Sequence, residues 1–191
     1  MSIIRLTERK LRDARFRKKE EAIFEVFFDG NNGGQLSVKE LARKAGVDKA
    51  TLYRHHRAIR EIVGDYEDYI LKKYVRSVQI VRKKENVDLR RIYYDMIIFI
   101  LQNREVFRAL MMMRDFGVIE KMVLILKPEM VDFVGLPSGH ERVLMVHGGE
   151  IVGLIIEWGI SGLEEERITR LLNDMMYLSE TAKTRLMPLL N

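Results

Sequence analysis

The four histidines are the first residues to consider for metal chemistry, because the chain contains no cysteine. His55 and His56 are adjacent and would point apart on a helix. His140 and His147 do not have the i, i+4 spacing that two ligands of one metal would need on a helix. Neither pair has acidic residues at ligand spacing, so the sequence predicts no metal site and no cofactor.

Acidic side chains are the other candidates for catalytic residues. Asp95, Glu150 and Glu157 lie in largely apolar segments, where they could enter the pocket of an all-helical enzyme. However, the chain has no glycine-rich phosphate loop, no nucleophile elbow and no HExxH motif. We therefore expect a protein that is not an enzyme and has no catalytic residues.

The segment from Ser37 to His56, which reads SVKELARKAGVDKATLYRHH, carries the strongest functional signal. Ser37 and Glu40 have the spacing of a capping box, which predicts a helix start. Gly46 ends that short helix and permits a left-handed turn before a second one. Three apolar residues, Leu41, Val47 and Leu52, would fix the pair to a supporting helix. This pattern predicts a helix-turn-helix, although a structural helical hairpin has the same spacing.

The elements that position this motif are predicted to be helices throughout. Apolar residues recur with a helical period, and only three prolines interrupt the chain, at positions 128, 137 and 188. After the motif we expect helices at about 57–81, 88–101, 103–113, 116–126, 140–160 and 164–182, with a break near 135–139. The predicted organisation is all-α, with a smaller domain at 1–60 that holds the motif and a larger helical domain at 61–191.

Charge is distributed unevenly between these two parts. Residues 1–60 hold 15 Lys/Arg and 8 Asp/Glu, a balance of +7, whereas residues 61–191 hold 18 and 20, a balance of −2. A basic end on a nearly neutral remainder favours contact with a polyanion. A basic, solvated helix face without a nucleic-acid partner is the alternative that charge alone leaves open.

The motif resembles the DNA-binding domain of the tetracycline-repressor (TetR) family. The matching residues are Ala45-Gly46-Val47 and Thr51-Leu52-Tyr53-Arg54-His55, and the resemblance covers about residues 14–65. It implies a three-helix helix-turn-helix domain followed by a helical ligand-binding and dimerisation domain. Two residues depart from the family pattern: His56 replaces the usual Phe, and Ile59 replaces a Lys that contacts phosphate.

The resemblance also implies which side chains meet a palindromic, double-stranded DNA operator. Lys49, Ala50 and Thr51 would face base edges, whereas Tyr53, Arg54 and His55 would meet phosphates and sugars. Ser37 and Lys39 would touch the DNA backbone from the preceding helix. Arg57 and Arg60 flank Ile59, and we expect them to supply the missing phosphate contact.

Methionine and aromatic residues beyond the motif predict an effector cavity or a plain core. The resemblance implies that some of them line a pocket for a small apolar or amphipathic effector, since methionine repacks easily. The candidates are Met96, Phe99, Phe107, Met111, Phe116 and Met122.

The last two predicted helices carry apolar stripes that would suit a dimeric four-helix bundle, as the resemblance implies. Gly149 and Gly153, one turn apart, indicate close packing there. The predicted interface residues are Ile151, Leu154, Ile155, Trp158, Ile168, Leu171, Leu172 and Met175.

The sequence thus favours a cytoplasmic, homodimeric repressor that a small effector releases from DNA. No signal peptide or membrane-spanning segment is recognisable, so we expect no membrane partner. Two alternatives remain open: a TetR-type regulator, effector-independent or activating, that is controlled by a protein partner, and a helical partner-binding module.

Overall fold

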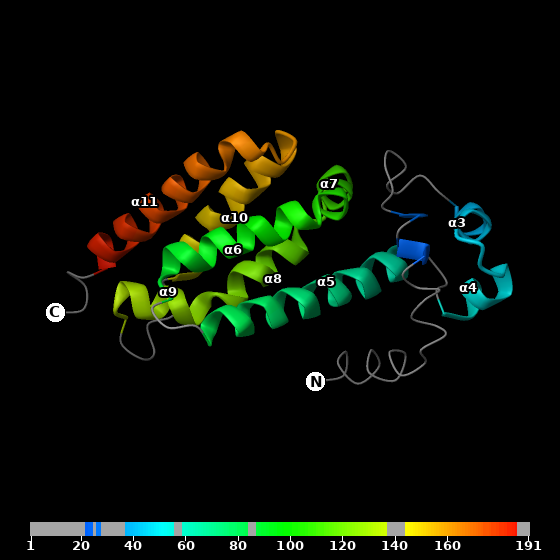
Figure 1. Cartoon of the computed structure of the whole chain (residues 1–191), viewed down its shortest axis with the longest axis horizontal. Helices are drawn as coiled ribbons and strands as arrows, with labels where there is room; N and C mark the ends of the chain where they lie inside the picture. Colours follow the sequence, from blue (N-terminus) through cyan, green and yellow to red (C-terminus); the bar gives the residue numbers. More distant parts are fainter. Residues whose placement is uncertain are drawn as a thin grey trace. The chain divides into compact units, whose positions relative to one another are not determined.

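The computed structural model of the chain describes residues 22–24, 26–27, 37–55, 59–83, 87–136 and 144–186 (Figure 1). These residues form helices and connecting turns without a strand, which confirms the all-α prediction. The chain divides into two compact units, residues 1–70 and 71–191. The division falls inside a helix, α5 (Ile59–Arg82).

The first unit contains the predicted motif as two short helices, α3 (Val38–Lys44) and α4 (Lys49–His55). The capping box is confirmed: the Glu40 amide donates to the Ser37 hydroxyl (3.3 Å), and the Ser37 amide donates to the Glu40 carboxylate (2.9 Å). The Ser37 hydroxyl and the Ser37 amide both donate to the Glu40 carboxylate and lower its pKa below the ordinary value, because they favour the charged form.

The core of the first unit is formed by side chains from four segments. Phe24 stacks edge-on against Tyr66 of α5 (Ile59–Arg82), with the two ring centroids 4.5 Å apart. The buried apolar residues here are Ile23, Phe24, Phe27, Leu41, Ala42, Val47, Leu52, Ile62, Val63 and Tyr66. This core is the support that a pair of helices as short as α3 and α4 needs, because isolated helices of such length are unstable in water.

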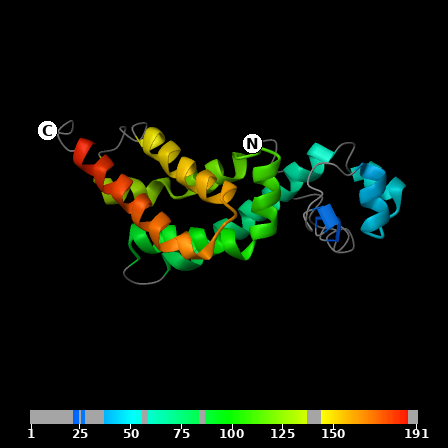
Figure 2. The same ribbon diagram turned by 90° about the horizontal axis from the view of Figure 1, so that it is seen from above.

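The second unit contains six further α-helices in its described part. They are α6 (Leu89–Gln102), α7 (Arg104–Met112), α8 (Gly117–Ile125), α9 (Lys127–Val134), α10 (Leu144–Ile160) and α11 (Ile168–Leu186), with a 3₁₀ turn at Glu165–Arg167. Helix α10 packs against α7, α8, α9 and α11. Helices α10 and α11 lie side by side and run in opposite directions (Figure 2).

Helix α9 is an element that the sequence analysis did not predict. A single residue, Leu126, separates it from α8. It carries Pro128 in its first turn, where proline needs no amide hydrogen. Gly135 ends it with a positive φ of 75°. The predicted start of the next helix at His140 lies outside the described residues.

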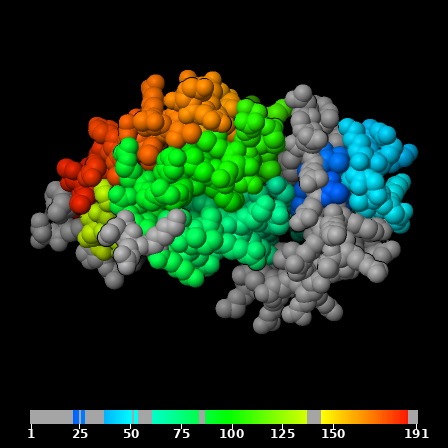
Figure 3. All heavy atoms as spheres, in the orientation of Figure 1, coloured from blue at the N-terminus to red at the C-terminus, as the bar shows by residue number. Residues whose placement is uncertain are grey.

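Helix α6 packs against α11, and the two helices meet at the surface of the second unit (Figure 3, green against orange to red). No helix in the described part of the chain combines the length and the apolar character that a membrane crossing requires.

Candidate nucleic-acid interface

The turn between α3 and α4 is built around Gly46, whose φ is +62°. This left-handed conformation strains residues that carry a Cβ, so glycine suits the position. The Ala45 amide donates to the Leu41 carbonyl and the Val47 amide to the Ala42 carbonyl, both at 2.9 Å. Because these bonds satisfy carbonyls at the end of α3, α4 can start after only four intervening residues.

One side of helix α4 packs into the core, and another side is exposed to solvent. Leu52 is buried, whereas Lys49, Ala50 and Tyr53 are exposed. Lys49 and Tyr53 are one turn apart, and the ammonium lies 5.5 Å from the centre of the Tyr53 ring. A cation beside an exposed phenol can meet a phosphate and a base edge together.

The remaining predicted DNA contacts are only partly described. Lys39 is exposed on α3. Ser37 is exposed too, but its hydroxyl donates to the Glu40 carboxylate at 2.7 Å and is thereby used for capping. Arg57 lies outside the described residues. The structure places the following residues in helices without describing their side chains: Thr51, Arg54, His55 and Arg60.

The residues predicted to line an effector cavity lie in or beside the packed core of the second unit. Met96, Phe107 and Met122 are fully buried, Phe99 and Met111 nearly so, and Phe116 is half-buried. Phe99 contacts Tyr74 and Phe107, with ring centroids 5.3 and 6.5 Å apart.

A groove of about 340 Å³ lies elsewhere, between α8, α9 and α10. None of the six predicted effector residues lines it. Its walls are mostly apolar, with Glu120 and Lys127 as the charged members, and are formed by Glu120, Val123, Leu124, Lys127, Met130, Leu144, Met145, Gly148, Gly149 and Val152.

Most residues predicted for a dimer interface are covered by the chain itself. Ile151, Ile155, Trp158, Leu171, Leu172 and Met175 are buried, whereas Leu154 and Ile168 are half-buried. Trp158 has a structural role: its indole nitrogen donates to the Glu164 carbonyl (3.0 Å) and so holds the corner between α10 and α11.

The opposite face of α10 is apolar and exposed. Its members recur at helical spacing, include two glycines and lack any charged side chain; they are Met145, Val146, Gly149, Val152, Gly153, Ile156 and Ile160. We call these seven residues the outer face of α10. A Cβ added at Gly149 or Gly153 would meet nothing within 4 Å, so the chain's own packing does not require glycine at either position.

A polar network is buried where α6, α10 and α11 meet. His147 Nε2 and the Tyr93 hydroxyl each lie 3.0 Å from the Ser179 hydroxyl, which donates to the Met175 carbonyl at 2.9 Å. The burial of Tyr93 raises the pKa of its phenol far above the ordinary value. Among the described residues, no cluster of three potential metal ligands occurs.

Comparison with known proteins gives no relative: no family model, no curated protein and no solved structure matches the chain. A functional assignment must therefore be argued from the chain's own residues.

Proposed function

We propose that the protein is a sequence-specific, DNA-binding transcriptional regulator of the tetracycline-repressor type that acts as a homodimer. The observation that carries this proposal is the two-sided character of α4. Leu52 anchors the helix in the core, while Lys49, Ala50 and Tyr53 are left exposed. The major groove of DNA is wide enough to admit such a helix.

Charge supports the same proposal. The balance of +7 over residues 1–60 supplies the attraction to phosphates on which DNA affinity depends, and the remainder of the chain lacks it. In this proposal Tyr53 contacts the sugar-phosphate backbone and fixes the position of α4. Lys49, at the start of the helix, reads base edges and contributes to sequence preference.

Regulation belongs to the second unit in this proposal. A small effector bound there releases the repressor, and it can do so only if it binds the released conformation more tightly than the DNA-bound one. A regulator controlled by a protein partner, or a partner-binding module that does not bind DNA, would share the same helices. The DNA experiment below separates the module from both kinds of regulator.

The test is selection of bound sequences from random duplex DNA, followed by affinity measurements on the selected site and on random duplex. We expect Tyr53→Ala to weaken both affinities by about tenfold, equivalent to about 1.4 kcal/mol. Lys49→Ala should also change the preferred sequence.

Two variants serve as matched controls. Tyr177→Ala removes an exposed tyrosine from α11, and Lys72→Ala removes one positive charge from α5; neither should change DNA affinity by more than about twofold. If the α4 variants behave like these controls, α4 is not the reading helix. If selection enriches no sequence, the protein is not a sequence-specific regulator.

A further inference from the structure

The groove between α8, α9 and α10 combines an apolar lining with one cation. Its volume of about 340 Å³ is within the range of pockets that hold small molecules. Lys127 is its single cationic lining residue and is half-buried. Glu120, the other charged member, is exposed to solvent.

The charge of Lys127 is not neutralised within the described part of the chain. Its ammonium has no ion pair or hydrogen bond there, and the nearby Glu129 is engaged by Arg82. A half-buried ammonium without a counter-charge is available to pair with the anionic group of a ligand.

We propose that this groove binds a monoanionic amphipath, an apolar chain or ring with one carboxylate or sulfonate, whose anionic group pairs with Lys127. Val123, Leu124, Met130, Leu144 and Val152 then cover the apolar part of the ligand. The site differs from the cavity that the sequence predicted, and ligand binding at it does not depend on the proposed DNA-binding function.

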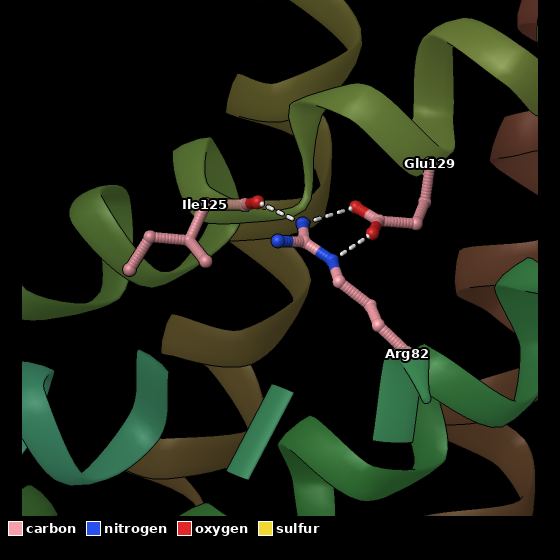
Figure 4. A network of polar contacts seen from close by, with 3 residues as sticks. All are labelled: Arg82, Ile125 and Glu129. Carbon is pink, nitrogen blue, oxygen red and sulfur yellow. Dashed lines mark hydrogen bonds and ion pairs between the residues drawn. The ribbon is translucent and has the colours of Figure 1, made fainter. Parts of the chain in front are cut away.

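The junction between α8 and α9 connects this site to α5 (Figure 4). Arg82, the last residue of α5, donates to the Ile125 carbonyl (3.0 Å) and to the Glu129 carboxylate (2.8 Å), and its Nε forms an ion pair with the same carboxylate. Ile125 ends α8 and Glu129 lies in the first turn of α9, so these two partners bracket Lys127.

Ligand in the groove therefore acts on the same junction that holds the end of α5. Because α5 begins in the first unit and ends at Arg82, this contact gives the ligand a route to the DNA-binding unit. This regulatory consequence rests on the proposed function.

Binding is tested on the full chain without DNA, with the fluorescent probe 1-anilinonaphthalene-8-sulfonate and with dodecanoate as competitor. We expect saturable binding of one probe per chain that dodecanoate displaces. Lys127→Gln should weaken it at least fivefold, and Leu124→Glu, at an exposed wall residue, should abolish it. The matched controls Lys72→Gln and Met112→Glu, which lie outside the groove, should bind like the wild type.

Three results would overturn the site. They are no saturable binding of the probe, equal probe affinity in all four variants, and groove variants that keep the probe affinity of the wild type but change the mass of the particle in solution. The last result would mean that a second copy fills the groove. None of them involves DNA, so failure here is distinguishable from failure of the proposed function.

Coupling to α5 is tested by amide hydrogen exchange over residues 75–83 with and without dodecanoate. We expect the ligand to change protection of this segment in the wild type but not in Arg82→Gln, which should still bind the probe. Binding without any change in α5 would overturn the coupling.

Discussion

His147 is buried among α6, α10 and α11, and its hydrogen bonds define which ring nitrogen carries the proton in the neutral form. The Ser179 hydroxyl has one hydrogen, which it donates to the Met175 carbonyl. It must therefore accept from His147 Nε2, which carries the proton in the neutral ring. His147 Nδ1 then has no hydrogen-bond partner, although the Glu150 carboxylate lies 3.6 Å away.

This geometry predicts a pH-dependent stability. Burial lowers the pKa of His147 below its ordinary value of 6.5, and the Glu150 carboxylate only partly opposes that effect. The unfolded chain therefore takes up a proton first as the pH falls. Stability from the neutral ring is fully present above pH 6.5 and is lost as the pH falls from there toward the folded-state pKa.

We expect His147→Gln to remove this dependence, because the glutamine amide can donate to Ser179 but does not titrate. Urea unfolding of both proteins between pH 7.5 and 5.5 measures the difference. Below pH 6.5 the wild type should lose stability relative to the variant, by at most about 1.4 kcal/mol per pH unit. Parallel curves for the two proteins would show that His147 does not titrate on unfolding.

At the scale of elements, sequence and structure agree best where contacts between residues close in the sequence determine the backbone conformation. Ser37, Glu40 and Gly46 specify a helix start and a left-handed turn through contacts within a few residues, and both features are present. Pro128 carries a comparable local signal for the start of α9, because proline is favoured in the first turn of a helix.

Helix α10 shows what periodicity cannot decide. Ile151, Ile155 and Trp158 recur at helical spacing, but so do Val146, Ile156 and Ile160 on the opposite side. Since both of these faces are apolar, the sequence does not say which one the chain covers itself. The groove was equally hidden, because a cavity depends on how side-chain volumes fit together and not on which methionines and aromatics are present.

Gly159 tests the packing of α10 against α7. A Cβ at this position would lie 2.5 Å from Met111 Cε and 3.0 Å from its Sδ. We expect Gly159→Ala to lower the free energy of unfolding by about 1–3 kcal/mol, despite the better helix propensity of alanine. Urea unfolding measures the change.

The control is the same substitution in a Met111→Ala background, where the clashing atoms are gone. There Gly159→Ala should no longer destabilise, so that the two changes are strongly coupled. Equal costs in both backgrounds would mean that the contact between Met111 and Gly159 does not explain the glycine.

At the scale of the whole molecule, a two-fold DNA site requires a two-fold protein, and the outer face of α10 is the surface we propose for it. Although α10 also carries the exposed Glu150 and Glu157, its outer face has no charged side chain, and contiguous exposed apolar patches mark interaction sites. The two glycines on this face cost about 1 kcal/mol each relative to alanine, and the protomer gives no close contact that offsets this cost. A second copy packed on the part of this face that lies outside the groove, around Val146, Gly153 and Ile160, would supply one, because isologous interfaces are self-complementary.

Such a dimer would present two copies of α4 to DNA, and operator half-sites would be spaced about one helical turn apart, roughly 34–36 Å. Ile155 and Leu171, two of the residues that the sequence predicted for the interface, are buried in the protomer. A charge there would unfold the chain and would say nothing about assembly. The exposed members of the outer face avoid this difficulty.

Ile160→Glu and Val146→Glu are therefore the informative variants, since these side chains are 70% and 72% exposed in the protomer. We expect the wild type to be a dimer at micromolar concentration and both variants to be monomers. A symmetric interface would bury two new charges, one from each protomer, and both would lose their hydration. Met112→Glu on α7, at a residue that is 68% exposed, is the matched control and should remain dimeric. Light scattering gives the mass and circular dichroism checks the fold. A monomeric wild type, or folded variants that stay dimeric, would exclude the outer face of α10 as the interface.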